Sequence, residues 1–434
     1  MSNIIYRPYQ VKAVSAGGNT DNGIVVAPTG SGKSVISAGL VKDFEGGTLI
    51  LQPSKEVLES NFAKAQALGI DAEIYSASMK TKNVGRVTYA TIKSIIGCLD
   101  KFAHVKNLII DECHLVNAKG GQYEQLISAL KPKHLIGMTA TPYRMATNSM
   151  GTFMRVLTRT KPKIFKDIVY NIQPFELVNA GFLLNPEFVA LDVDDSMLLS
   201  NSTGADFTAS SLELFSVRND LRGRAINLCE GIADRHRSIL IFSESVADSQ
   251  YIVEKLNGLG IAAAEINANT PAKERSGRLE KFHHGEIKVM VNVGTLTTGY
   301  DFPALDAIID ARPIMSVALH YQKVGRVVRP YPGKNPMVYD LAGNYFRLGN
   351  PLEYRMLQGK TGLWDLYSPF GRLTSVAIGE RERDTLVGFG KHKDKRIGEI
   401  PDSYLDWCLE EMTGDKKARF AVEAVRREAF GVAI

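Results

Sequence analysis

The chain of 434 residues has few cysteines and no long apolar run, and both absences exclude classes of protein. Its cysteines, Cys98, Cys113, Cys229 and Cys408, lie far apart without a CxxC pair, which argues against a disulfide framework and a zinc ribbon. No run of about 18 apolar residues occurs, so we expect no membrane-spanning helix and no membrane partner. The N-terminal "MSNIIYRPYQ" lacks the basic and apolar regions of a signal peptide, and the protein is expected to be cytoplasmic.

A large excess of one charge is also lacking. Lys and Arg outnumber Asp and Glu by 52 to 47, a balance that permits a nucleic-acid partner without requiring one. Hydrophobic residues make up 44% of the chain and no biased tract occurs, so the chain should fold throughout. The length exceeds what one hydrophobic core usually holds, which predicts two domains and a smaller third unit.

Short apolar runs rich in β-branched residues recur, each followed by turn residues and a helical pattern. They include "GIVVAPTG", "TLILQPS", "NLIIDE" and "HLIGMTATP", and later "SILIFSES", "KVMVNVGTLTTG" and "AIIDARP". This alternation predicts parallel strands that are buried on both faces and joined by helices. We predict an α/β fold with two such domains, residues 1–183 and 184–345, and a small, mainly helical module over 346–434.

The stretch "VVAPTGSGKS" combines an apolar run, a glycine-rich turn and a helical segment, which is the arrangement of a P-loop. Backbone N–H groups at the helix N-terminus would bind phosphate oxygens, Lys33 would reach the β and γ phosphates of ATP, and the Ser34 hydroxyl would bind Mg²⁺. The predicted phosphate-binding residues are Thr29, Gly30, Ser31, Gly32, Lys33 and Ser34. Ala27 replaces the first glycine of the strict pattern, and a plain strand–turn–helix is the alternative.

The stretch "LIIDECHLVN" places Asp111, Glu112, Cys113 and His114 side by side, and all four could bind metal. Zinc is disfavoured because no further cysteine or histidine lies nearby to complete a tetrahedral site. At the end of a buried strand next to the P-loop strand, Asp111 would hold Mg²⁺, and Glu112 would orient and deprotonate the attacking water. A charged loop after a strand is the alternative, and Cys113 is expected to be a small buried filler.

In "QKVGRVVRP", Arg326 and Arg329 lie three residues apart, so on a helix both can point into one crevice together with Gln322. Positive charge of this kind stabilises a γ-phosphate during transfer. A solvated basic face is the alternative. In "VGTLTTGYDFP", Gly299 and Asp301 follow a buried strand and could read the state of the bound nucleotide.

The ordered motifs "RPYQ", "APTGSGKS", "QPSKEV", "YATIKS", "DECH", "TATP", "VGTLTTGYD" and "QKVGRVVR" resemble those of the superfamily 2 helicases over residues 4–344. The resemblance implies two tandem RecA-like domains that clamp ATP between them while single-stranded nucleic acid runs across both. It also implies that Arg7 and Gln10 recognise adenine, and that His114, Thr139 and Thr141 couple the ATP site to the strand. The residues it implies along the nucleic-acid backbone are Pro53, Ser54, Thr91, Ser243 and Thr295.

Longer segments, among them "RPIMSVALHYQKVGRVVRPYPGK" and "YDLAGN", resemble the RadD-type DNA-repair ATPases. This resemblance implies an ATP-dependent DNA helicase or translocase in repair, recombination or replication. Single-stranded or branched DNA would be its partner, along with single-strand-binding or other repair proteins. The cysteine-rich zinc region of that family is absent here, so no zinc is expected. An RNA helicase, or a nucleic-acid binding protein that ATP switches without unwinding, are the alternatives.

The segment "FGKHKDKRIGEIPDSYLDWCLEEM" resembles the C-terminal module of exonuclease X-type proteins. Its basic loop contains Lys391, Lys393, Lys395 and Arg396, and Tyr404 and Trp407 follow three residues apart on an expected helix. Basic groups beside aromatic rings suit phosphate contacts combined with base stacking. Alternatively, the aromatic residues form the core of a small domain and the lysines are simply solvated.

Overall fold

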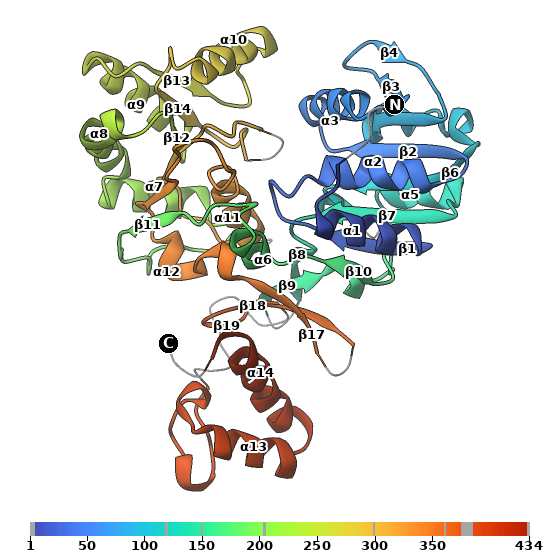
Figure 1. The fold of residues 1–434 in the computed structure, drawn as a ribbon. Coiled ribbons are helices and arrows are strands. Elements are labelled where there is room, and N and C mark those ends of the chain that lie inside the picture. Colours follow the sequence, from blue (N-terminus) through green and yellow to red (C-terminus); the bar gives the residue numbers. More distant parts are fainter. Residues whose placement is uncertain are drawn as a thin grey trace.

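The computed structural model describes residues 5–117, 120–148, 151–202, 205–297, 300–359, 362–374 and 385–431. Figure 1 shows two α/β lobes side by side and a smaller helical module below them. Within these ranges, none of the helices combines the length and the apolar character needed to cross a bilayer.

The first lobe is built on an eight-stranded sheet in the order β10-β1-β7-β6-β2-β5-β3-β4, parallel except for the β3–β4 pair. Its strands are β1 (Asn22–Val26), β2 (Gly47–Gln52), β3 (Glu73–Ser76), β4 (Thr81–Lys82), β5 (Val87–Thr91), β6 (Val105–Asp111), β7 (His134–Thr139) and β10 (Ile168–Asn171). Its helices are α1 (Pro8–Gly18), α2 (Lys33–Asp43), α3 (Lys55–Ala67), α4 (Ile92–Ile95) and α5 (Gln122–Leu130). The unbroken apolar runs of the sequence became strands buried on both faces, as parallel sheets require.

One expectation about strand order is wrong. The strand that ends at Asp111 was expected next to the P-loop strand, but β7 lies between β6 and β1 and pairs with both. Sequence order does not determine which strands pair when every connection is a crossover. The consequence is small, because the carboxyl ends of all three strands still meet at one edge of the sheet.

The second lobe is built on a fully parallel sheet in the order β11-β16-β15-β12-β14-β13. Its strands are β11 (Glu187–Ala190), β12 (Ile239–Phe242), β13 (Ala263–Ile266), β14 (Val289–Asn292), β15 (Ala307–Asp310) and β16 (Met337–Asp340). Its helices are α7 (Ala209–Arg218), α8 (Leu221–Ile232), α9 (Val246–Gly258), α10 (Ala272–His283), α11 (Val317–Val324) and α12 (Asn344–Leu348). A short helix, α6 (Pro174–Asn179), separates β10 from β11. The chain therefore changes sheets close to the predicted division after residue 183, which itself stays a prediction.

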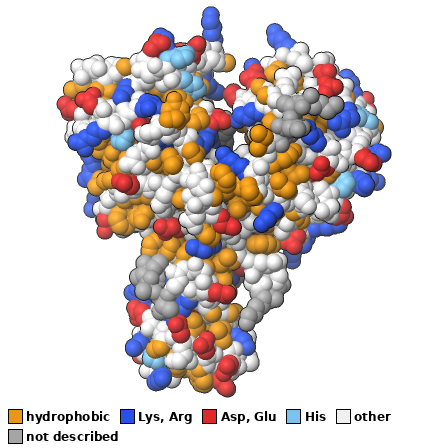
Figure 2. All heavy atoms as spheres, in the orientation of Figure 1, with side chains coloured by type: hydrophobic (Ala, Val, Ile, Leu, Met, Phe, Trp, Pro, Cys, Tyr) orange, Lys and Arg blue, Asp and Glu red, His pale blue; other side chains and the backbone are white. Residues whose placement is uncertain are grey.

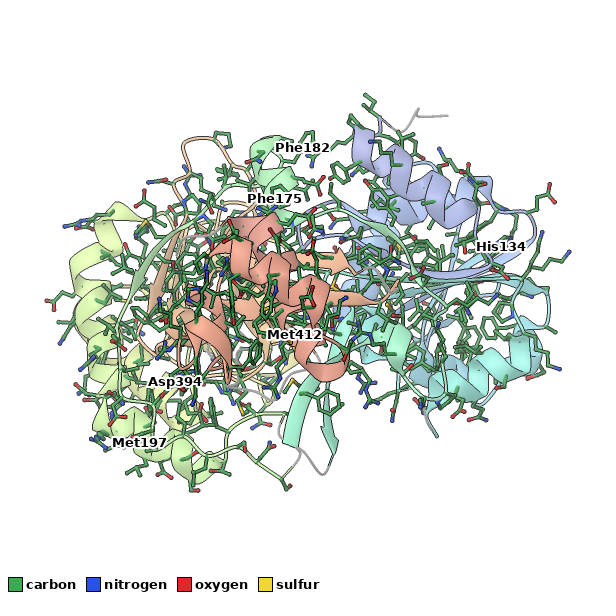
Figure 3. All side chains as sticks on the ribbon, turned by 90° about the horizontal axis from the view of Figure 1, so that it is seen from below. His134, Phe175, Phe182, Met197, Asp394 and Met412 are labelled. Atoms are coloured by element: carbon green, nitrogen blue, oxygen red, sulfur yellow. The ribbon has the colours of Figure 1, made fainter. Side chains whose placement is uncertain are left out.

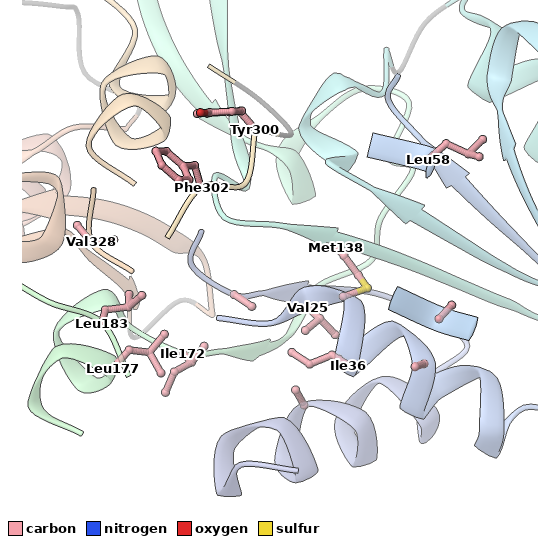
Figure 4. Packing of buried hydrophobic residues seen from close by; sticks show 14 of the residues in the cluster. Val25, Ile36, Leu58, Met138, Ile172, Leu177, Leu183, Tyr300, Phe302 and Val328 are labelled. Carbon is pink, nitrogen blue, oxygen red and sulfur yellow. The ribbon is translucent and has the colours of Figure 1, made fainter. Parts of the chain in front are cut away.

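The two lobes pack directly on one another. One buried hydrophobic cluster contains Val25 and Met138 from the first sheet together with Phe302 and Val328 from the second lobe. Figure 4 shows this cluster, with Leu183 on the segment between the lobes. The contact surface is thus apolar over part of its area, and the polar cleft described below lies within this interface.

The chain forms additional β structure outside the two large sheets. A hairpin, β8 (Tyr143–Asn148) and β9 (Gly151–Val156), follows β7, and β17 (Arg355–Gln358), β18 (Trp364–Ser368) and β19 (Gly371–Arg372) form a small antiparallel sheet. Residue 356 returns to the first lobe, because Gln173 Nε2 donates to Met356 O at 2.7 Å and Gln173 Oε1 accepts from Met356 N at 3.1 Å. The predicted helical character of residues 346–434 missed these strands, which depend on contacts with a distant part of the chain.

The C-terminal module contains α13 (Asp402–Glu411) and α14 (Gly414–Phe430) and lies nearest the viewer in Figure 3, with Asp394 and Met412 labelled. Its small core consists of Val387, Ile397, Ile400, Tyr404, Leu405, Cys408 and Phe420. The buried Arg426 side chain joins the module to the turn between β18 and β19, since its Nη1 donates to Pro369 O at 3.2 Å.

Candidate functional site

The turn between β1 and α2 has the backbone that a phosphate-binding loop requires. Gly30 and Gly32 have φ angles of 83° and 80°, in the left-handed region that glycine adopts without strain. A Cβ at Gly32 would lie 2.7 Å from Gln10 Nε2, so a side chain there would displace a neighbour. The buried Ser31 hydroxyl has no partner among the described residues. The N-terminus of α2, with Lys33 at its first position, faces the cleft between the lobes.

The two carboxylates after β6 have opposite electrostatic environments. Burial, then the charge of Glu112, raises the pKa of Asp111 to about 6. Burial alone would also raise the pKa of Glu112, but Lys33, whose Nζ lies 3.5 Å from Glu112 Oε1, and His114 lower it to about 2. Glu112 is therefore ionised at neutral pH. Its φ of 46° costs a non-glycine residue about 1–2 kcal/mol, so the surrounding contacts hold the side chain in this orientation.

The structure brings the predicted coupling residues together. His114 Nδ1 lies 2.9 Å from Thr139 Oγ1 and 3.3 Å from Thr141 Oγ1, and both threonines are buried. The same nitrogen lies 3.3 Å from Glu112 Oε2. From the second lobe, Gln322 Nε2 lies 3.5 Å from His114 Nε2. A continuous polar chain therefore connects the two lobes, and the coupling role of these residues stays a prediction.

Helix α11 carries the predicted arginines to the same cleft. A Cβ at Gly325 would lie 2.9 Å from Thr29 Cβ, so this glycine lets the end of α11 approach the P-loop. Arg326 Nη2 donates to Thr297 O at 2.7 Å and its Nη1 to Tyr300 O, while Arg329 Nη2 donates to Tyr300 O at 3.0 Å. Burial lowers the pKa of both arginines to about 10, so both remain cationic at neutral pH.

These groups line a cleft of about 210 Å³ between the lobes. The predicted residues along it are Thr29, Gly30, Gly32, Lys33, Ser34, Asp111, Glu112, Asp301, Gln322, Arg326 and Arg329. Predicted Gly299 lies outside the described residues. The walls therefore combine cations from both lobes with carboxylates and a hydroxyl, which are the oxygen donors that Mg²⁺ prefers.

Helix α3 contributes cleft residues that the motifs did not indicate. Asn61 Nδ2 donates to Asp111 Oδ2 at 3.1 Å and to Gln52 Oε1 at 3.0 Å, which fixes the carboxylate, and Lys64 reaches across to Asp301. Val57 and Ser60 line the cleft as well. These positions follow the i, i+3, i+4, i+7 spacing of one helix face, and that spacing was the signal available in the sequence.

Arg7 and Gln10 lie behind the P-loop. Gln10 Nε2 donates to Ser31 O at 3.0 Å, Gln10 Oε1 accepts from Arg7 N at 2.9 Å, and the Arg7 guanidinium lies 4.3 Å from the centroid of the Phe182 ring. Phe182, labelled in Figure 3, is an aromatic residue beside this pair that sequence reasoning missed. Contact of Arg7 and Gln10 with adenine stays a prediction, but their hold on the P-loop is part of the fold.

The predicted nucleic-acid track follows the carboxyl ends of strands in both sheets. Thr91 ends β5, Ser243 follows β12, and Thr295 follows β14. Pro53 and Ser54 come directly after β2, where the Ser54 hydroxyl accepts from Val57 N at 3.3 Å and caps α3. The structure places these residues on loops at the edge where parallel sheets bind ligands, and their contact with nucleic acid stays a prediction.

The basic loop of the module lies apart from the cleft residues. Lys391 Nζ lies 5.9 Å from the centroid of the Tyr404 ring, and Trp407 stacks on Tyr404 with centroids 5.2 Å apart. Tyr404 is 7% exposed and belongs to the module core, whereas Trp407 is 42% exposed. Lys393, Lys395 and Arg396 are exposed on the same loop. Figure 2 shows acidic side chains among the basic ones on this module, so the patch is of mixed charge.

The sequence matches two known families. Residues 3–144 match the family described as "Type III restriction enzyme, res subunit", and residues 224–331 match the "Helicase conserved C-terminal domain". The "Putative ATP-dependent helicase IRC3" of Saccharomyces cerevisiae is 25% identical over 359 residues, 76% of this chain and 50% of that protein. The "Putative DNA 3'-5' helicase Rad25" of Halobacterium salinarum is 26% identical over 352 residues, 77% of this chain and 54% of that protein. The chain thus spans about half the length of these relatives.

Solved structures share the fold. A fragment of a putative HsdR subunit of a type I restriction enzyme from Vibrio vulnificus has a TM-score of 0.60 at 19% identity, over 80% of this chain and 66% of that one. The Saccharomyces cerevisiae protein Dbp5, bound to RNA and ADP BeF3, has a TM-score of 0.51–0.56 range neighbour value of 0.52 at 15% identity, over 80% of this chain and 86% of that one. The predicted fold class, two tandem RecA-like domains, is thereby confirmed.

Proposed function

Because this chain is a helicase-family protein of superfamily 2, we propose that it is a nucleic-acid-stimulated ATPase that moves along DNA or separates its strands. We further propose that it serves DNA repair, recombination or replication. The RadD-type character and the exonuclease X-like character of the C-terminal module belong to this proposal, as do the cytoplasmic location and single-strand-binding proteins as partners.

The observation that carries the proposal is the meeting of two half-sites in one cleft. Lys33 and Glu112 come from the first lobe and Arg326 and Arg329 from the second, and all four line the same cavity. Each arginine keeps a buried Nε that has no partner among the described residues, so a phosphate oxygen can still accept from it. A binding protein without turnover does not need an ionised glutamate here, and Glu112 therefore favours hydrolysis.

The residues of the cleft also fit Mg²⁺. The Ser34 hydroxyl and the Asp111 carboxylate, oriented by Asn61, line the cleft beside Lys33 and would hold the ion directly or through water. When bound, Mg²⁺ neutralises charge on the β and γ phosphates. The protein's own residues then do the rest: Lys33 binds phosphate, Glu112 takes the proton of the attacking water, and Arg326 and Arg329 stabilise charge on the transferred group.

DNA is the substrate that the comparisons favour. The relative from Halobacterium salinarum is named a DNA 3'-5' helicase, as is an XPB protein of Kineococcus radiotolerans at 27% identity. The Dbp5 structure contains RNA, but at 15% identity it supports the fold alone. Translocation would follow from closure of the cleft on ATP and its reopening after hydrolysis, because the predicted strand contacts lie on both lobes.

The test is a panel of steady-state ATPase rates without nucleic acid, with single-stranded DNA and with single-stranded RNA of the same sequence at one salt concentration. We expect DNA to stimulate turnover more strongly than RNA. Stimulation by RNA alone would decide for an RNA helicase. ATP binding without turnover under any of the three conditions would decide for a nucleotide-switched binding protein.

A second contact with nucleic acid is proposed at Lys391, Lys393 and Arg396 of the module. Its support is the exposed basic loop beside the half-exposed Trp407. Replacing Lys391 and Lys393 by alanine should lower the slope of log K against log salt by about 1.4 on single strands, at about 0.7 per phosphate. An unchanged slope would assign the module to a structural or docking role.

A further inference from the structure

One carboxylate is shared between the two lobes in the cleft. Asp301 Oδ2 accepts from Lys64 Nζ of α3 at 2.7 Å, and Asp301 Oδ1 contacts Arg329 Nη1. Lys64 belongs to the first lobe, whereas Asp301 and Arg329 belong to the second. The second predicted arginine is thus held by an acid that already has another cation from the opposite lobe.

The three side chains differ in burial. The Arg329 side chain is 12% exposed, while those of Lys64 and Asp301 are 43% and 40% exposed. Arg329 packs against the P-loop, since a Cβ at Gly30 would lie 3.1 Å from Arg329 Cγ. Burial and the charge of Arg329 lower the pKa of Lys64, which agrees with two cations close together. Arg329 is therefore beside the phosphate position but bound to Asp301.

Phosphate binding creates a conflict at this carboxylate. For Arg329 to turn its guanidinium to a γ-phosphate, it has to give up the ion pair with Asp301. Without another cation, Asp301 would then be left uncompensated in a cleft that also holds Asp111, Glu112 and the incoming phosphates. A part-buried charge without a partner is strongly unfavourable. Lys64 is the cation already in place to prevent this.

We propose that Lys64 is a positioning residue that holds Asp301 and so releases Arg329 to the phosphates. The inference rests on the proposed ATPase function and deepens it. Lys64 lies outside the sequence motifs, on the face of α3 that lines the cleft. Because its partner is on the second lobe, the same pair favours the closed arrangement in which Arg329 can act.

The first experiment compares Lys64→Ala with wild type in DNA-stimulated ATP hydrolysis. We expect kcat to fall roughly tenfold, within the range of couplings between contacting charges, while KM for ATP changes by less than about twofold. Lys64→Arg should retain most of the turnover, because it preserves the charge. The matched control is Lys166→Ala, which removes a Lys166–Asp21 pair of 2.9 Å whose side chains are 62% and 66% exposed and lie within the first lobe. It should leave both constants unchanged.

The second experiment adds Asp301→Asn to Lys64→Ala. A neutral amide no longer retains Arg329, so the double variant should recover much of the turnover that Lys64→Ala loses. An unchanged kcat in Lys64→Ala would overturn the inference. So would a raised KM without recovery in the double variant, which would mean that Lys64 binds phosphate itself. A wild-type protein without nucleic-acid-stimulated turnover would instead refute the proposed function, so the two failures are distinguishable.

Discussion

Buried arginines serve different purposes in the cleft and in the C-terminal module. In the module, Glu423 accepts from Arg426 Nε at 2.8 Å and Nη2 at 2.7 Å and from Arg427 Nε at 2.8 Å. Burial would lower the pKa of Arg427, but Glu423 and Asp402 raise it. In the cleft, Arg326 donates to backbone carbonyls and burial lowers its pKa. A buried arginine compensated by carboxylates is structural, whereas one held by carbonyls keeps its charge available for an anionic ligand.

The largest expected effect tests the cleft side of this comparison. Arg326→Ala should reduce kcat for ATP hydrolysis by about 10³-fold or more, as loss of an arginine finger does. The reason is that its charge compensates no carboxylate and is available to the transferred phosphate. Steady-state turnover is the measurement, with the thermal midpoint as a control for folding. A variant that loses stability but keeps turnover would make Arg326 structural and break the comparison.

The next effect concerns the glutamate opposite the arginines. Glu112→Gln should lower kcat by about 10²–10⁴-fold, because the amide cannot accept the proton of the attacking water. ATP should still bind through Lys33, so the variant should remain on single-stranded DNA in the ATP-bound form. Turnover and DNA retention are measured together. Wild-type turnover would show that Glu112 is not the base.

The module side is tested by Glu423→Ala. This change leaves Arg426 and Arg427 without their shared carboxylate, and breaking such a buried pair costs about 3–5 kcal/mol. Hydrogen exchange of the α13 and α14 amides should report the local loss of stability. ATPase turnover without DNA should stay at the wild-type value, because the network lies outside the cleft. Protection equal to wild type would remove the structural role assigned to these arginines.

The smallest expected effect concerns the exposed surface of the module. Trp407→Ala should weaken binding of single-stranded DNA by about 1–3 kcal/mol, the contribution of one stacked base. Val217→Ala is the control, since Val217 is an exposed apolar residue on α7 of the second lobe. Equal affinities in a fluorescence anisotropy titration would mean that Trp407 only covers Tyr404.

The sequence predicted those parts of the site whose function depends on local spacing. The P-loop glycines, the Asp111–Glu112 pair and the two arginines of α11 each lie within one short motif, and parallel topology brings their strand ends together. Lys64 escaped prediction because its partner Asp301 is 237 residues away and only tertiary packing joins them. The position of β7 between β1 and β6 escaped for a similar reason, since local patterns do not fix strand order.

The small sheet of β17 to β19 has the same explanation. Its strands are short, and Met356 is held by Gln173 of a distant segment rather than by a strong local preference. In the module, the apolar pattern indicated helices, but it could not decide whether Tyr404 and Trp407 are core or surface. The structure divides them, with Tyr404 buried and Trp407 half-exposed.

The most direct test of the central claim is the single-stranded-DNA-stimulated ATPase rate of Lys33→Ala beside that of wild type. The account predicts that DNA raises the wild-type rate and that Lys33→Ala has no measurable turnover with or without DNA, while both proteins bind DNA with similar affinity. Wild-type turnover that DNA leaves unchanged, or turnover that survives in Lys33→Ala, would contradict it.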